Sequence, residues 1–174
     1  MNLFFLSQNP VECAQWHCDK HVVKMILELV QMLYAAHHCC GEPLESAPLC
    51  KSTGLPGYKL AHKNHPMTKW VRESRSNYRF TIRVASALCV EFEHRYHHYH
   101  GCTTHVLWLA ASVPRFLPFG SGRTEVPQCM PDEYKVEGNS IRAYRNYYIG
   151  DKSRFAKWTL RPTPPWWTPE TNSD

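Results

Sequence analysis

The feature of the sequence that most constrains its fold is a strongly apolar helical pattern near the N-terminus. On a helical wheel at 100° per residue, the stretch from His17 to Tyr34 places apolar side chains on an arc of roughly 220°. A helix with so wide an apolar arc must be enclosed by other elements. The pattern therefore predicts a helix at the centre of a packed domain, with one polar stripe left over.

The polar stripe of this helix carries the first candidate site residues. Its members recur at helical spacing and are His17, Lys20, His21, Lys24, Glu28 and Gln31. The two lysines can hold an anion while His21 or Glu28 moves a proton. In the alternative, Lys24 and Glu28 form an ordinary surface pair worth about 0.2–0.5 kcal/mol. The stripe is thus either the wall of a cleft or a narrow window to solvent.

Glycines and prolines divide the chain into helices and irregular segments. Asn9 and Pro10 have the residue types of a helix start, and residues 3–6 form either a short strand or an apolar tether. The expected helices span residues 10 to about 38, 66 to about 98, 103–112 and 140 to about 160. The sequence therefore predicts one all-α, single-domain helical bundle over residues 1–174, in which 113–136 are irregular and 161–174 form a tail rich in Pro and Trp.

Basic residues form a ridge on the second expected helix. They lie within about 60° of one another on the wheel and are Lys69, Arg72, Arg75, Arg79 and Arg83. Such a ridge extends for about 20 Å, which matches several successive phosphates of a nucleic acid. The alternative is a solvated ridge that neutralises acidic side chains of other elements. His65 stands at the start of this helix, where anions are attracted, and Asn77 lies at the margin of its apolar stripe, where it would orient a ligand.

Two later segments add further candidates. Asp132 and Glu133 lie in a loop and are expected to bind Mg²⁺ or act as a base; alternatively, Asp132 only caps a turn. Arg145, Tyr148 and Lys152 share one face of the last expected helix. Cations interleaved with aromatic rings suit a base stacked beside its phosphates, although lysine stems covering a tyrosine-rich core give the same pattern.

Metal binding is a weak alternative. The chain has eight cysteines but no C-x-x-C pair, and the histidines between His94 and His105 match no standard zinc spacing. We therefore expect free thiols, several of them buried, and no bound metal ion in the histidine stretch.

Charge and hydropathy narrow the partner and the compartment. Residues 1–60 carry four basic and five acidic side chains, whereas residues 61–174 carry sixteen and ten. A positive half favours an anionic partner such as a nucleotide or a nucleic acid. No apolar run approaches the roughly 18–20 residues that cross a bilayer, and the opening MNLFFLSQNP lacks a basic leader. We expect a cytoplasmic protein without a membrane span.

Several short runs together resemble a known family. They are Asp19-Lys20-His21-Val22-Val23-Lys24-Met25, His65-Pro66 with Trp70 and Asn77, Met130-Pro131-Asp132-Glu133-Tyr134, and Tyr144-Arg145 with Tyr147-Tyr148 and Lys152. This combination resembles a family of small proteins from tailed phages and other large DNA viruses, over about residue 3 to Trp167. The resemblance implies a viral accessory protein in the host cytoplasm, in a setting where proteins of this size serve nucleotide or DNA metabolism.

These observations predict a protein that binds a nucleotide or nucleic acid, and an enzyme of nucleotide metabolism or DNA modification. Lys20, Lys24 and Arg145 would hold phosphate, and His21 or Glu28 would move a proton, with the reaction class left open. The alternatives are a non-catalytic DNA- or RNA-binding module that uses the arginine ridge, a host-directed interaction protein that uses the tail, and a zinc protein. No nucleotide-binding fingerprint of the GxxxxGK[ST] or GxGxxG type is present.

Overall fold

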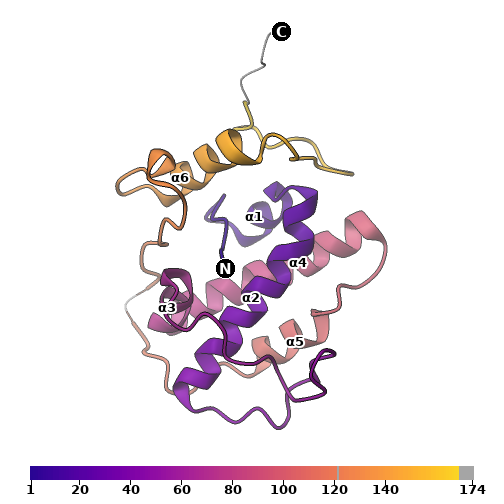
Figure 1. Cartoon of the computed structure of the whole chain (residues 1–174), viewed down its shortest axis with the longest axis vertical. Coiled ribbons are helices and arrows are strands. Elements are labelled where there is room, and N and C mark those ends of the chain that lie inside the picture. Colours follow the sequence, from indigo (N-terminus) through magenta and orange to yellow (C-terminus); the bar gives the residue numbers. More distant parts are fainter. Residues whose placement is uncertain (121, 169–174) are drawn as a thin grey trace.

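The computed structural model describes residues 1–120 and 122–168, and Figure 1 shows that they form a helical molecule. Over these ranges no β-sheet is present, which confirms the all-α prediction, and no helix is long and apolar enough to cross a membrane. The elements are α1 (Pro10–Trp16), α2 (Asp19–Cys40), α3 (Pro66–Glu73), α4 (Arg75–Tyr96), α5 (Thr103–Ala111), the 3₁₀ turn η1 (Asp132–Tyr134), α6 (Ser140–Tyr147) and the π-helical turn η2 (Tyr148–Lys152).

Helix α2 lies at the centre of the core. Helices α3, α4 and α5 all pack against it, and α4 crosses it near the middle of the molecule (Figure 1). Its side chains Val22, Ile26, Leu29 and Leu33 are at most 1% exposed. Burial of each such side chain contributes about 1.5–3 kcal/mol. The observed burial confirms the enclosed helix that the wide apolar arc predicted.

The prediction of one continuous first helix was wrong, because two helices, α1 and α2, occupy this stretch. The predicted start is confirmed: Asn9 caps α1 by accepting a hydrogen bond from the amide of Val11, and Pro10 is the first helical residue. His17 and Cys18 then adopt extended backbone before α2 begins. Neither glycine nor proline marks the break, because long-range contacts of Asp19 impose it.

The second predicted helix is also two helices. Ser74 is extended, with φ −151° and ψ 158°, and its Oγ accepts a hydrogen bond from the amide of Asn77 at 3.1 Å to begin α4. The amide of Arg75 donates to the carbonyl of Pro118 at 2.7 Å, so the irregular segment holds the break open. The predicted ridge is therefore divided: Lys69 and Arg72 lie on α3 and the other three cations on α4.

The last predicted helix ends early, whereas the third is confirmed as α5. Helix α6 stops at Tyr147 and continues only as the π-helical turn η2. A Cβ atom at Gly150 would clash with the ring of Tyr134, so the turn requires a glycine there to bring that ring close. The prediction of a regular helix to about residue 160 was wrong because its periodicity could not show this contact.

The N-terminal segment is buried inside the helices. Leu3, Phe4, Phe5 and Leu6 are at most 5% exposed, and no strand pairs with them among the described residues. The ring of Phe4 stacks on His21 of α2 at a centroid distance of 4.3 Å. Figure 1 accordingly shows the N-terminus in the interior of the molecule beside α2.

A buried ion network joins α1, α2, α4 and the C-terminal segment. The guanidinium of Arg95 donates to Asp19 and to Glu91, both at 2.7 Å, and to the carbonyl of Gln15 at 2.9 Å. Its side chain is completely buried, and Glu91 also accepts from Arg161 at 2.9 Å. The network thus fixes the break between α1 and α2 from the far end of α4.

Replacement of Arg95 by methionine should destabilise the fold. Methionine keeps much of the side-chain volume but leaves buried carboxylate oxygens without their donor, which typically costs about 3–5 kcal/mol. Urea denaturation followed by circular dichroism measures this loss. Arg142→Met on the exposed face of α6 is the matched control and should change the free energy of unfolding by less than about 0.5 kcal/mol. A similar small change for Arg95→Met would contradict the role of the network.

Candidate active site at the N-terminal amino group

The start of the chain meets one carboxylate of α2. The α-amino nitrogen of Met1 lies 3.6 Å from Oε2 of Glu28, and the amide of Asn2 donates to the same oxygen at 2.7 Å. On the other side, Nζ of Lys24 lies 3.5 Å from Oε1 of Glu28. The side chain of Glu28 is only 13% exposed. One half-buried carboxylate is therefore flanked by two amines.

Asn2 fixes the position of the terminal amino group. Its side-chain amide donates to the carbonyl of Cys129 at 3.0 Å, and its Oδ1 accepts from the hydroxyl of Tyr144 at 2.9 Å. The side chain of Met1 is itself only 3% exposed. The amine of Met1 is therefore held by segments from both ends of the chain, whereas the side chain of Lys24 is 69% exposed.

A pocket of about 450 Å³ lies next to this pair of residues. It is lined by His65, Pro66, the segment 127–131, Lys135 and Tyr147. Burial lowers the pKa of His65, and the nearby terminal ammonium group lowers it further, with Glu28 acting in the opposite direction. Asn2 bonds to Cys129 in the pocket wall. The pocket therefore gives a ligand a place to lie beside the amine and Glu28.

Three other lysines, Lys20, Lys135 and Lys152, contact aromatic or acidic side chains. Lys152 donates to the hydroxyl of Tyr147 at 3.0 Å, and Lys135 pairs with Asp132 at 2.6 Å. The Nζ atom of Lys20 lies 4.9 Å from the ring centroid of Phe155. Of the predicted phosphate-binding lysines, Lys24 pairs with Glu28, whereas Lys20 contacts Phe155 and Lys152 contacts Tyr147 in the pocket wall.

His21 and Tyr148 are brought together in the core. Nδ1 of His21 lies 2.5 Å from the hydroxyl of Tyr148, and both residues are buried. Burial lowers the pKa of His21 to about 3, so its ring stays neutral near pH 7. The predicted roles of His21 in proton transfer and Tyr148 in ligand binding therefore find no support in this geometry.

Arg145 and Asn77 have polar partners within the protein. The guanidinium of Arg145 donates to the carbonyl of Leu6 at 2.9 Å. The side chain of Asn77 donates to the carbonyl of Trp70 at 2.9 Å and accepts from the amide of Thr124 at 3.1 Å, and it is fully buried. Both residues position the segments that carry the site, and their predicted contacts with a ligand remain predictions.

Asp132 and Glu133 lie on η1 at the surface. The side chain of Asp132 is 93% exposed, and the hydrogen bond from Lys135 lowers its pKa. Over residues 1–120 and 122–168 no group of three or more His, Cys, Asp or Glu side chains could hold a metal ion. The eight cysteines are free, and five of them are buried. The predicted Mg²⁺ site at Asp132 and Glu133 thus has no third ligand of this kind.

The divided ridge uses two of its arginines within the fold. Arg72 donates to the carbonyl of Lys63 at 2.7 Å, and Arg75 donates to the carbonyl of Arg115 at 3.0 Å. Lys69, Arg79 and Arg83 are exposed. Because the ridge is broken at Ser74, it cannot follow a row of phosphates as one straight helix, which corrects the geometry inferred from the wheel.

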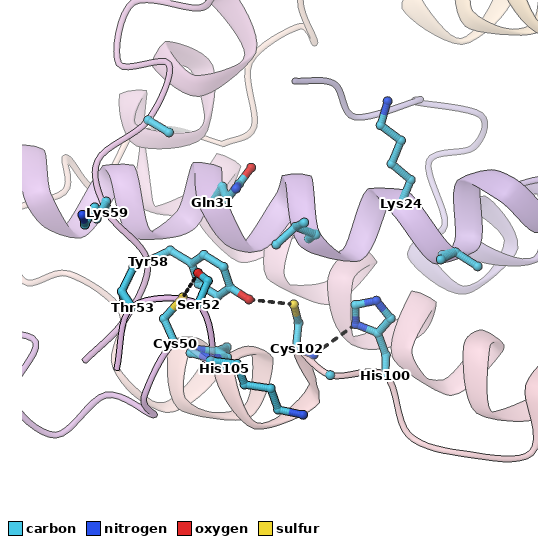
Figure 2. Close-up of a pocket in the computed structure, with 15 residues that line it drawn as sticks. Lys24, Gln31, Cys50, Ser52, Thr53, Tyr58, Lys59, His100, Cys102 and His105 are labelled. Atoms are coloured by element: carbon cyan, nitrogen blue, oxygen red, sulfur yellow. Dashed lines mark hydrogen bonds between the residues drawn. The ribbon is translucent and has the colours of Figure 1, made fainter. Parts of the chain in front are cut away.

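A second pocket, of about 770 Å³, lies on another side of α2 (Figure 2). Cys50, Tyr58, Cys102 and His105 line it, and the hydroxyl of Tyr58 lies 3.4 Å from Sγ of Cys102. In Figure 2 the side chain of Lys24 extends from α2 away from the centre of this pocket. Of the polar-stripe residues that the sequence singled out, only Lys24 and Gln31 line it.

Sequence reasoning missed the amino group of Met1 and the amide of Asn2. The signal was present in the four apolar residues 3–6, because their burial carries the start of the chain into the core. The sequence placed Glu28 on the polar stripe of α2. The stripe alone could not show that the amino group of Met1 lies beside it.

Comparison with known proteins gives one match. The model of a family described as pyrimidine dimer DNA glycosylase matches residues 1–104, which include Glu28 and His65. No curated protein and no solved structure matches the chain. The viral setting and the cytoplasmic location stay predictions.

The buried histidines should make the fold sensitive to acid. Burial lowers the pKa of His21 to about 3 and that of His17 to about 4, from 6.5. Below pH 6.5 the unfolded chain binds protons that the folded chain does not, so stability falls as the pH drops from about 6.5 toward 4. Each histidine contributes at most about 1.4 kcal/mol per pH unit.

Urea denaturation between pH 7.5 and 4.5 measures this dependence. His21→Gln should reduce the slope of the unfolding free energy against pH by up to one proton, whereas His94→Gln at the exposed end of α4 serves as the control. An unchanged slope in His21→Gln would show that His21 does not cause the acid sensitivity.

Proposed function

Because the chain belongs to the pyrimidine dimer DNA glycosylase family, we propose that it cleaves the glycosidic bond of a damaged pyrimidine nucleotide in DNA, with the α-amino group of Met1 as nucleophile and Glu28 as its partner. Membership of this family confirms the coarser prediction of an enzyme that modifies or repairs DNA. The lesion and the residue roles are the proposal.

The arrangement around Glu28 is the observation that carries this proposal. A glycosylase must displace a base from C1′ of deoxyribose through a transition state with positive charge on the sugar. A carboxylate held beside C1′ stabilises that charge, and it also accepts the proton that an ammonium group must lose before it attacks. Glu28 is half-buried and lies 3.6 Å from the α-amino nitrogen of Met1, so it is placed for both roles.

The proposed reaction proceeds in two steps. The amine of Met1 forms a bond to C1′ while the C1′–base bond breaks, and the base leaves with the electron pair and takes up a proton. The new secondary ammonium group then loses a proton to give a neutral amine, the C1′–O4′ bond opens as O4′ gains a proton, and a protonated imine joins the protein to the sugar. Amines commonly act on carbonyl-type carbons through such imines.

Lys24 is the competing nucleophile, because its amine also lies near Glu28. Met1 is favoured because its side chain is buried and because Asn2 ties the adjacent backbone to Cys129 and Tyr144. A held amine loses less conformational freedom on reaching the reactive geometry than the end of an exposed lysine does. Lys24 instead has the exposure expected of a residue that contacts phosphate.

The pocket and the lysines supply the binding part of the proposal. Lys24 beside Glu28 and Lys135 in the pocket wall provide positive charge, which favours the DNA backbone. Tyr147 lines the 450 Å³ pocket, and Nζ of Lys152 lies 4.3 Å from the centroid of its ring. These features support a DNA substrate brought to Glu28 rather than a free metabolite.

Glu28→Gln should abolish most of the activity while it preserves the fold. Glutamine can still accept the hydrogen bond from the amide of Asn2, but it carries no charge and cannot take a proton. We expect the single-turnover rate on a DNA duplex with one cyclobutane pyrimidine dimer to fall by at least about 100-fold. Glu93→Gln, an exposed glutamate on α4, should leave the rate unchanged. Near-normal cleavage by Glu28→Gln would refute the proposed role.

Borohydride should trap the imine at residue 1. Reduction during the reaction would give a covalent protein–DNA complex, and mass spectrometry of its peptides would locate the adduct. A chain extended by a few residues before Met1 has a peptide nitrogen in place of the amine and should lose both trapping and cleavage, whereas the same extension at the C-terminus should not. An adduct on Lys24, or trapping that survives the N-terminal extension, would assign the nucleophile elsewhere.

A further inference from the structure

A third pocket, separate from the Glu28 site, is rich in arginine. It has a volume of about 420 Å³ and lies between the segment 8–10 and the N-terminal half of α4. The side chains that matter to its chemistry are Gln8, Ser76, Arg79, Phe80, Arg83 and Arg123. Sequence reasoning placed two of these arginines on the ridge but missed Arg123, which comes from the irregular segment.

The positive charge of this pocket is not neutralised. None of the lining residues is acidic. In the part of the chain that the structure describes, neither Arg79 nor Arg83 makes a hydrogen bond or an ion pair through its side chain, and both are exposed. They are one helical turn apart, so about 6 Å of rise separates them along α4. Their donors are therefore free for an external anion.

Arg123 is held in place by aromatic rings. Its guanidinium lies 4.1 Å from the ring centroid of Phe80 and 4.9 Å from that of Phe5, and it donates a hydrogen bond to Gln8. A guanidinium presents five N–H donors in a rigid fork, and stacking on a ring leaves those at its edge free to reach an anion. The pocket thus combines one fixed cation with two that can adjust.

The same contacts indicate which anion fits. Phe80 is only 7% exposed, and the guanidinium of Arg123 covers one face of its ring. The pocket therefore offers no free aromatic face on which a base could stack. It provides charge and hydrogen-bond donors alone, which suits phosphate groups without regard to the bases attached to them.

We propose that Arg79, Arg83 and Arg123 form a binding site for backbone phosphates of nucleic acid, distinct from the site that contains Glu28. This inference rests on a nucleic-acid substrate but not on the chemistry proposed for Met1. Gln8 lies seven residues after Met1, so the chain itself limits the distance between the two sites to about 25 Å. A phosphate site at such a distance would hold DNA outside the damaged nucleotide.

Binding to undamaged DNA tests this site. Fluorescence anisotropy with a labelled 20-base-pair duplex gives the dissociation constant over a series of salt concentrations. Arg79→Gln together with Arg83→Gln should weaken binding about tenfold at low salt and reduce the slope of log K against log salt by one to two, because about 0.9 is lost per phosphate contact. An unchanged dissociation constant and slope would overturn the proposal.

A second double variant tests whether weaker binding comes from loss of this particular site or only from a lower net charge. Arg142→Gln with Lys157→Gln removes two exposed cations elsewhere and should affect binding much less. An equal effect of both double variants would also overturn the proposal. Circular dichroism confirms that the arginine variants fold. Because the duplex is undamaged, this binding measurement involves no cleavage, so a failure here is distinguishable from a failure of the chemistry proposed at Glu28.

Small anions provide the remaining arm of the test. Inorganic phosphate and thymidine monophosphate are added to the protein while its thermal unfolding is followed. Backbone binding predicts weak effects of similar size for the two. A much larger stabilisation by the mononucleotide that disappears in Arg79→Gln/Arg83→Gln, with duplex binding unchanged in that variant, would identify a nucleotide site instead and contradict the proposal.

Discussion

Burial of residues 3–6 is the constraint on which the rest of the structure depends. Each of these four side chains is at most 5% exposed, and burial of each contributes about 1.5–3 kcal/mol. Because they lie between α2, α4 and η2, the amino group at the start of the chain cannot move away from Glu28 without loss of core contacts. Hydrophobic packing thus determines the position of the charged amino group at Met1.

The basic side chains differ in burial and in whether acidic side chains pair with them. The cation most deeply buried, Arg95, is matched by Asp19 and Glu91 and serves the fold. Cations near Glu28 are partly exposed, where they can exchange protein contacts for phosphate contacts. The net charge of +5 therefore does not show that some basic residues are matched by buried acids while others are exposed.

Periodicity in the sequence predicted the features of the fold that depend on neighbouring residues. The apolar arc identified α2 as the central helix, and its polar stripe contained Glu28. The breaks at His17 and Ser74 were not predictable in this way, because contacts with Arg95 and with the segment around Pro118 produce them. Asn77 illustrates the opposite error: a polar residue on a buried stripe suggested a ligand contact, yet Trp70 and Thr124 supply its hydrogen bonds. Cys129 and Tyr144, which hold the side chain of Asn2, lie more than 125 residues away, beyond the reach of any periodicity.

The anchoring of Asn2 has a consequence for truncated forms of the protein. Asn2 is held by Cys129 and Tyr144, which lie after the segment 1–104 that the family model matches. A chain that lacks the last third keeps the packing of residues 3–6 on α2 and α4 but loses both of these hydrogen bonds to the side chain of Asn2. The arrangement around Glu28 therefore depends on the folding of residues well beyond the segment that the family model matches.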